Sequence, residues 1–335
     1  MIPTIQKLAS TLMTPGKGIL AADESESTMS KRLTSIGVQD NTENGRRFRD
    51  LLFTAPDVEE YLSGVILFDS TIRGMSNSGE HFGRLLERKG IMPGIKVDKG
   101  LQPAPNFAQE EISHGLDGLR ERLDEYYQLG ARFTKWRSVI RITNDLPSDT
   151  ILRANAHILA YYAAIVQEKH MVPMVEPEVL FEGTHTLERS GEVLHKTLKY
   201  VFEELQAFRV SLSGLVLKTS MALPGSESGI AINPMLVARE TVRVLKDVVP
   251  FSTAGIVFLS GGQTPIQATE NLNAIALLGN LPWPITFSYS RALEEPVLEA
   301  WKGLDANTDV AQKALLHRLS LNVAARKGAY KKEME

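Results

Sequence analysis

The sequence predicts a single-domain α/β protein that folds as a TIM (β/α)₈ barrel over residues 1–335. Three observations predict this fold. Eight short apolar segments have the character of buried strands, amphipathic stretches separate them, and charged residues collect at their carboxyl ends. No linker rich in Pro, Gly or Ser divides the chain.

The eight apolar segments contain few alternating polar positions, and most are rich in β-branched or aromatic residues. Such continuous runs are typical of parallel strands buried on both faces of a sheet. Successive segments begin from 29 residues apart (63 to 92) to 47 residues apart (16 to 63), which leaves room for a helical crossover. In chain order they are residues 16–23, 63–69, 92–98, 133–140, 171–179, 213–220, 254–261 and 283–290.

Residues 148–169 show the clearest helical pattern between these segments. Ser148 is a good N-cap residue, and apolar residues then recur at helical spacing. Residues 264–278 and 306–327 show the same spacing, so residues 306–335 are expected to form a C-terminal helix and a short tail. A doubly wound open sheet is the alternative fold. Its glycine-rich phosphate turn would follow the first strand, whereas the glycines of GKGIL precede it here.

The composition narrows the possible functions. The absence of cysteine excludes disulfides, thiolate catalysis and cysteine-ligated zinc. Seven histidines, none at HxxxH spacing, argue against a His-ligated metal, so neither a metal nor a cofactor is expected. A net charge of −3 argues against a nucleic-acid partner. No apolar run reaches bilayer length and no secretory signal is visible, so a cytoplasmic protein without a membrane partner is expected.

Polar residues interrupt the apolar segments mainly at their carboxyl ends, where barrel enzymes build their active sites. Residues i and i+2 of a strand point to the same side, so three segments each direct two charges to one side of the barrel. Any one of these residues can equally be a solvated strand end, but the agreement of eight segments favours a shared site. The three pairs are Lys96 with Asp98, Lys135 with Arg137, and Glu176 with Glu178, and the other strand-end residues are Asp23, Asp69, Lys218, Ser260, Gly261, Gly262, Ser288 and Arg291.

Lys218 is the best candidate for a nucleophilic amine. A Schiff-base lysine must lose its proton, and both the apolar run before Lys218 and a neighbouring cation such as Lys135 favour the neutral amine. Carbinolamine formation and dehydration need proton transfers, which Glu176 and Glu178 can supply. Asp23 is a third carboxylate that can move a proton on a substrate hydroxyl.

Two groups of residues can bind phosphate. The loops after the last two segments, SGGQT and SYSR, offer glycine N–H groups, serine hydroxyls and the guanidinium of Arg291. The second group follows Asp23 at a predicted helix start, where an ordinary capped helix is an equally good explanation. It comprises Ser25, Ser27, Thr28, Lys31 and Arg32. Two anion sites with a lysine between them indicate a substrate with phosphate at both ends.

The sequence resembles class I fructose-1,6-bisphosphate aldolases in nine motifs that occur in family order and run from residue 16 to residue 293. Several are long, so together they are highly specific. They are GKGILAADES (16–25), NTENGRRFRDLLFTAP (41–56), GIKVDKG (94–100), FTKWR (133–137), VPMVEPEVL (172–180), LVLKTSM (215–221), GIVFLSGGQ (255–263), NLNAI (271–275) and TFSYSRAL (286–293).

The resemblance implies a homotetrameric, metal-independent lyase of glycolysis and gluconeogenesis. It would cleave fructose 1,6-bisphosphate reversibly to dihydroxyacetone phosphate and glyceraldehyde 3-phosphate. Lys218 would form the Schiff base, Glu176 would be the acid and base, and the catalytic neighbours would be Asp23, Lys135 and Glu178. The expected substrate-binding residues are Ser260, Gly261, Gly262, Ser288, Ser290 and Arg291 at one phosphate, Ser25, Thr28 and Lys96 near the other, and Arg137.

Three stretches depart from the family pattern. SYGR is SYSR here, so Ser290 replaces a glycine whose N–H contacts phosphate, and a positive φ at this position would be costly for serine. LLKPNM is VLKTSM, which keeps Lys218. Animal and plant members end in a tail whose terminal tyrosine assists proton exchange, whereas this chain stops at Glu335 and Tyr330 does not occupy that place. Proton exchange is therefore expected to be slower or to use another group, such as Glu176.

Other functions are also compatible with parts of this pattern. A lysine aldolase with a shifted substrate, such as sedoheptulose 1,7-bisphosphate or a monophosphate, is the nearest alternative. A non-catalytic scaffold has no need for buried charges, although fold alone does not settle function. A glycosidase needs two carboxylates that flank the bond, whereas Glu176 and Glu178 lie on one strand, about 6–7 Å apart by strand rise. A metal-dependent aldolase needs clustered histidines, which the sequence lacks.

Overall fold

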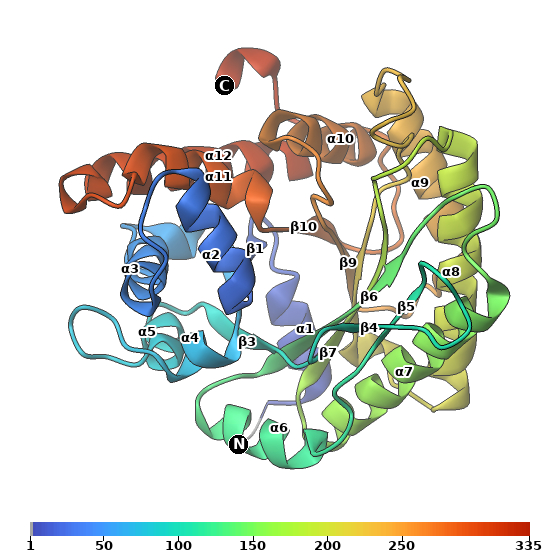
Figure 1. The fold of residues 1–335 in the computed structure, drawn as a ribbon, viewed down its shortest axis with the longest axis horizontal. Coiled ribbons are helices and arrows are strands. Elements are labelled where there is room, and N and C mark those ends of the chain that lie inside the picture. The colour runs from blue at the N-terminus through green and yellow to red at the C-terminus, as the bar shows by residue number, and fades with distance from the viewer. Residues whose placement is uncertain (1–2) are drawn as a thin grey trace.

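Residues 3–335 of the computed structural model are described here, and their central feature is a closed barrel of eight parallel strands (Figure 1). The order around the barrel is β1-β10-β9-β8-β7-β6-β3-β2. Each strand overlaps one predicted segment, so the predicted TIM barrel is confirmed. The strands are β1 (Gly18–Ala22), β2 (Leu62–Leu67), β3 (Met92–Lys96), β6 (Phe133–Ile140), β7 (Val172–Val179), β8 (Val216–Thr219), β9 (Gly255–Phe258) and β10 (Ile285–Tyr289).

Helices surround the barrel on the outside (Figure 1). The predicted helices at 148–169, 264–278 and 306–327 form α7, α10 and α12. The hydroxyl of Ser148 accepts the N–H of Ile151, as expected of an N-cap residue. The helices are α1 (Ile5–Leu12), α2 (Glu26–Ser35), α3 (Thr42–Phe53), α4 (Asp69–Arg73), α5 (Phe82–Arg88), α6 (Leu119–Gln128), α7 (Asp149–Glu168), α8 (Leu187–Ala207), α9 (Pro234–Val248), α10 (Pro265–Leu277), α11 (Arg291–Trp301) and α12 (Thr308–Arg326). None of those formed within residues 3–335 is long and apolar enough to cross a bilayer.

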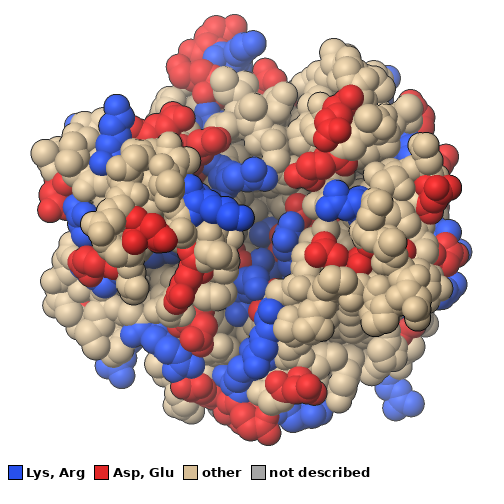
Figure 2. Space-filling view, viewed as in Figure 1, with Lys and Arg blue, Asp and Glu red and all other residues tan. Residues whose placement is uncertain are grey.

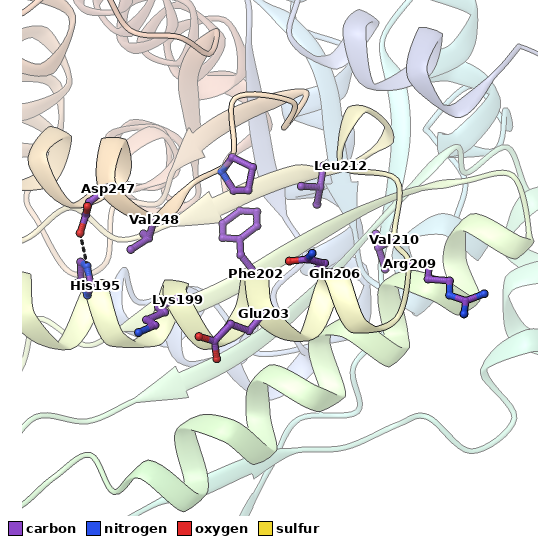
Figure 3. Close-up of a pocket in the computed structure, with 11 residues that line it drawn as sticks. His195, Lys199, Phe202, Glu203, Gln206, Arg209, Val210, Leu212, Asp247 and Val248 are labelled. Atoms are coloured by element: carbon purple, nitrogen blue, oxygen red, sulfur yellow. Dashed lines mark hydrogen bonds and ion pairs between the residues drawn. The ribbon is translucent and has the colours of Figure 1, made fainter.

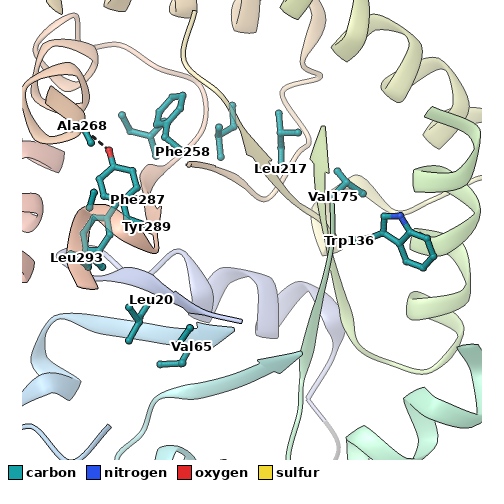
Figure 4. Close-up of a cluster of buried hydrophobic side chains, with 14 of the residues drawn as sticks. Leu20, Val65, Trp136, Val175, Leu217, Phe258, Ala268, Phe287, Tyr289 and Leu293 are labelled. Atoms are coloured by element: carbon teal, nitrogen blue, oxygen red, sulfur yellow. Dashed lines mark hydrogen bonds between the residues drawn. The ribbon is translucent and has the colours of Figure 1, made fainter. Parts of the chain in front are cut away.

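Two hydrophobic clusters hold the barrel together. The larger one packs the outer faces of the strands against the helices, and Figure 4 shows part of it around Leu217 and Phe258. The smaller one fills the barrel interior, where side chains of α1 such as Leu12 pack against Phe133 and Val216. Each fully buried side chain of this size contributes about 1.5–3 kcal/mol to folding. Helix α1 therefore closes one end of the barrel, and the polar strand ends lie at the other.

A small antiparallel sheet between β3 and α6 was not predicted. It pairs β4 (Leu101–Pro103) with β5 (Glu111–Ser113). Its three-residue strands are too short to give an apolar alternation, and Pro103 argues against a strand. The sheet is tied to the barrel because Trp136 donates a hydrogen bond of 2.8 Å from Nε1 to Oγ of Ser113.

Strand register brings the charged strand ends together. Lys96 on β3 lies opposite Lys135 on β6, and Arg137 on β6 lies opposite Glu176 on β7. Since neighbouring strands lie about 4.8 Å apart, the members of each pair lie side by side, and the two pairs form successive levels at the open end of the barrel.

Candidate active site

A pocket of about 710 Å³ opens at the carboxyl ends of the strands. Figure 2 shows a hollow near the middle of this face, with Lys and Arg side chains gathered in and around it. Fourteen of the predicted site residues line the pocket: Asp23, Ser25, Thr28, Lys96, Lys135, Arg137, Glu176, Glu178, Lys218, Ser260, Gly261, Ser288, Ser290 and Arg291. Gly262 is not among the lining residues, although its backbone lies beside Arg291.

Glu176 stands between the two buried lysines. Its Oε1 is 3.0 Å from Nζ of Lys218, and its Oε2 is 3.1 Å from Nζ of Lys135. Lys135 also lies 2.6 Å from Oδ2 of Asp23. All four side chains are almost fully buried. The sequence predicted Lys135 as a cation near Lys218. In the structure the carboxylate of Glu176 lies between the two lysines and contacts both.

The protonation states of Glu176 and Lys135 depend on the opposite charges that each contacts. Burial alone would raise the pKa of Glu176, but Lys135 and Lys218 outweigh burial and lower it to about 2. Burial would lower the pKa of Lys135, but the carboxylates of Asp23 and Glu176 raise it above its usual range. At neutral pH the site therefore holds an ionised Glu176 and a charged Lys135.

Two further ion pairs form the wall of the pocket beside this cluster. Nε of Arg137 contacts Oε2 of Glu178, and Nζ of Lys96 contacts Oδ1 of Asp98. Burial would lower the pKa of Arg137, but Glu178 and Glu176 raise it above its usual range. Arg137 is thus paired with a carboxylate from the next strand, and Lys96 with one that directly follows its own strand.

The segments after β9 and β10 have the properties of an anion site. Gly261 (φ +52°) and Gly262 (φ +90°) adopt left-handed conformations that favour glycine and turn their backbone at the pocket edge. The Oγ of Ser288 is buried and makes no hydrogen bond to any described residue. Ser290 has φ −109°, so the predicted cost of a positive φ does not arise. Arg291 begins α11 and lines the same pocket.

The second predicted anion group is both a helix cap and part of the pocket wall. Oγ of Ser25 accepts the N–H of Thr28 at 3.4 Å, which is ordinary capping. Lys31 and Arg32 also line the pocket, whereas Ser27 lines a different cavity on the far side of α2. The two explanations left open by the sequence are therefore compatible with each other.

Two sequence interpretations need adjustment. Asp69 does not line the pocket: it starts α4, where it accepts a hydrogen bond of 2.8 Å from Tyr126 and pairs with Arg73. Glu24 was missed, yet it is buried and lines the pocket. The only sequence signal for it was its place directly after Asp23 at a strand end.

A cavity of about 750 Å³ between α8 and α9 is slightly larger than this pocket (Figure 3). Its polar groups lie near the surface, as in the 2.6 Å contact between Nε2 of His195 and Oδ2 of Asp247. Apolar residues such as Phe202 and Val248 form much of its wall. It does not contain the buried ion cluster, so the chemistry is assigned to the barrel pocket.

Comparison with known proteins identifies the family. The family profile described as fructose-bisphosphate aldolase class-I matches residues 4–335. The "Probable fructose-bisphosphate aldolase class 1" of Xanthomonas campestris pv. campestris is 48% identical over 332 residues, which cover 98% of this chain and 99% of that protein. The "Fructose-bisphosphate aldolase 4, cytosolic" of Arabidopsis thaliana is 46% identical over 96% of this chain and 82% of that protein.

A solved structure agrees with these relatives. Fructose-bisphosphate aldolase from Plasmodium falciparum, in complex with TRAP and a small-molecule inhibitor, superposes with a TM-score of 0.96 at 43% identity, over 98% of this chain and 95% of that chain. The resemblance found in the nine motifs is confirmed. This chain belongs to the class I fructose-bisphosphate aldolase family.

Proposed function

We propose that this chain cleaves D-fructose 1,6-bisphosphate reversibly to dihydroxyacetone phosphate and D-glyceraldehyde 3-phosphate through a Schiff base on Lys218. The observation that carries the proposal is the buried contact of Glu176 with both Lys218 and Lys135, at 3.0 and 3.1 Å. A nucleophilic amine, a carboxylate able to exchange its proton, and a fixed cation are the groups that this chemistry requires.

Schiff-base formation begins with proton transfer from Lys218 to Glu176. The neutral amine adds to the C2 carbonyl of the ketose and gives a carbinolamine. Loss of the charge on Lys218 removes one of the cations that lower the pKa of Glu176, so its carboxyl can hold the proton. It then protonates the departing hydroxyl, water leaves, and an iminium ion remains on Lys218.

Cleavage needs a base at the C4 hydroxyl of the substrate. Asp23 is suited to this role because Lys135 holds its carboxylate at 2.6 Å within the pocket. As the C4 hydroxyl loses its proton, the C3–C4 bond breaks and its electrons move into the iminium, which becomes an enamine. Glyceraldehyde 3-phosphate leaves, the enamine takes a proton at C3, and water releases dihydroxyacetone phosphate and restores Lys218.

Phosphate binding would orient the ketose. We propose that the phosphate on C1, next to the reacting carbonyl, binds at Ser260, Gly261 and Arg291. These residues line the pocket after β9 and β10, the strands that follow β8 around the barrel. The phosphate on C6 is placed at the start of α2, near Ser25 and Lys31. This arrangement favours a bisphosphate over a substrate with one phosphate.

The wider setting of the reaction is also part of the proposal. The names of relatives from Arabidopsis thaliana and Cicer arietinum, "cytosolic" and "cytoplasmic isozyme", support a cytoplasmic location. A role in glycolysis and gluconeogenesis is what the aldolase family implies. A homotetramer follows from the family resemblance, and exposed apolar side chains such as Phe251, which is 72% exposed, are available for subunit contacts.

Product analysis in excess EDTA tests the proposed reaction. Purified protein incubated with fructose 1,6-bisphosphate should release equimolar dihydroxyacetone phosphate and glyceraldehyde 3-phosphate at the same rate with and without the chelator. Activity that disappears with EDTA would contradict the metal-independent mechanism. Faster cleavage of sedoheptulose 1,7-bisphosphate would support the shifted-substrate alternative.

A further inference from the structure

A buried polar network joins the two anion-binding segments of the pocket. It consists of Ser290 before α11, Glu294 in α11, Glu24 after β1, Arg32 in α2 and Arg49 in α3. Glu294 is fully buried, and Arg49 is 4% exposed. These residues come from both ends of the chain, so the network is a product of barrel closure.

Arg32 is the centre of this network. Its Nη1 lies 2.7 Å from Oε1 of Glu24 and also contacts Oε2 of Glu294. Its Nη2 donates a hydrogen bond of 2.9 Å to Oγ of Ser290. Both terminal nitrogens of the guanidinium are therefore held by protein groups.

The hydroxyl of Ser290 links the two segments by hydrogen bonds to Glu24 and Arg32. This hydroxyl donates to Oε1 of Glu24 at 2.5 Å while it accepts from Arg32. The other oxygen of Glu24 is bound by Nη2 of Arg49. A glycine at position 290, as in the SYGR motif, has no hydroxyl and can make neither bond. The link is therefore made by the serine side chain itself.

The fixed guanidinium lies at the α2 side of the pocket, where the proposed function puts the second phosphate. Arg32 lines the pocket together with Lys31 and Ser25, and 15% of its side chain is exposed. An unrestrained arginine samples many rotamers, and holding it in one orientation reduces the entropy lost on binding an anion. Its carboxylate partners supply that restraint before the substrate arrives.

We propose that Ser290 and Glu294 are positioning residues that hold Arg32 at the α2 end of the pocket and thereby set the preference for a second phosphate. This inference rests on the proposed function for the identity of the ligand. The positioning itself is a property of the side chains and can be tested without turnover. Ser290 and Glu294 act on substrate binding through Arg32 and take no part in the chemical step.

The kinetic test compares fructose 1,6-bisphosphate with fructose 1-phosphate. Ser290→Ala should raise the KM for the bisphosphate roughly tenfold more than the KM for the monophosphate, because a hydrogen bond to a charged group is weakened. The loss should fall on KM and not on kcat. Ser290→Thr keeps the hydroxyl and should restore the wild-type ratio of the two KM values.

Glu294 provides a second, independent pair of variants. Glu294→Ala removes an acceptor from Arg32 and should shift the KM ratio in the same direction as Ser290→Ala. Glu294→Gln keeps an amide oxygen as acceptor and should lie closer to wild type. Equal KM changes for both substrates, or a loss confined to kcat, would overturn the proposal.

Crystal structures of the wild type and of Ser290→Ala supply a readout that does not depend on activity. The proposal expects Arg32 to be ordered in the wild type and displaced or disordered in the variant. An Arg32 that stays in place in Ser290→Ala would refute the positioning role, even if the enzyme cleaves the bisphosphate. A wild type that does not cleave the bisphosphate would instead refute the proposed function and leave the structural comparison to decide the positioning role.

Discussion

Oε1 of Glu176 lies 3.0 Å from Nζ of Lys218, so the candidate nucleophile is in direct contact with an ionised carboxylate. Its other oxygen is engaged by Lys135, which stays charged. A proton can therefore pass between Lys218 and Glu176 without rearrangement of either side chain.

Lys218→Arg should abolish cleavage. Arginine keeps a cation beside Glu176 but offers no nucleophilic amine, so activity should fall by about 10⁴-fold or more. Steady-state assays with fructose 1,6-bisphosphate measure the effect. Lys246→Met, on the exposed side of α9, is the control and should stay close to wild type. Substantial activity in Lys218→Arg would place the nucleophile elsewhere.

Glu176→Gln should slow both formation and dehydration of the carbinolamine. The amide cannot accept the proton of Lys218, and loss of a positioned acid or base typically costs about 10²–10⁴-fold in rate. Rapid-quench trapping of the covalent intermediate measures this step directly. Unchanged trapping kinetics would show that another group moves the proton.

Lys135→Met should destabilise the fold as well as reduce activity. It leaves the buried carboxylates of Asp23 and Glu176 without their shared cation, which costs about 3–5 kcal/mol of unfolding free energy. Urea unfolding measures the change. Lys196→Met breaks an exposed ion pair with Asp149 and should cost less than about 1 kcal/mol. Equal losses in the two variants would contradict the buried-cluster account.

Stability should decrease in acid through Glu176. Its pKa is lowered in the folded protein from 4.5 to about 2, because the nearby cations outweigh burial. A lowered pKa stabilises the fold above pH 4.5, and this contribution is lost as pH falls towards 2. It amounts to roughly 3 kcal/mol. The difference in unfolding free energy between wild type and Glu176→Gln, measured from pH 7 to pH 3, should shrink with acid. A constant difference would argue against the lowered pKa.

Arg291→Ala should weaken phosphate binding at the segments after β9 and β10. Loss of a charge-assisted hydrogen bond should raise the KM for fructose 1,6-bisphosphate by about 10–100-fold. Inorganic phosphate should become a correspondingly weaker competitive inhibitor. Arg88→Ala, which only breaks an exposed pair with Glu80, is the matched control. Parallel changes in both variants would remove Arg291 from the phosphate site.

The sequence was sufficient to predict the barrel and the end of it at which the charged strand-end residues line a pocket. Strands buried on both faces leave continuous apolar runs, and the period of two along β7 correctly assigns Glu176 and Glu178 to the same side. The β4–β5 hairpin could not be predicted, because strands of three residues carry too little pattern.

Contacts between distant segments were beyond prediction from one sequence. The inward direction of Lys135 and Lys218 follows from local pattern, but the position of Glu176 between them depends on the register that barrel closure imposes. Glu24 was missed for the same reason, since its partner Arg49 comes from α3. Local periodicity contains no information about such pairs.

Borohydride trapping tests the central claim most directly. The protein is incubated with fructose 1,6-bisphosphate in excess EDTA, reduced, digested and mapped by mass spectrometry. A reduced sugar-phosphate adduct on Lys218, absent from Lys218→Arg, is the predicted result. Cleavage without any adduct, or an adduct on Lys135 or Lys96 instead, would contradict the assignment of Lys218 as the Schiff-base lysine.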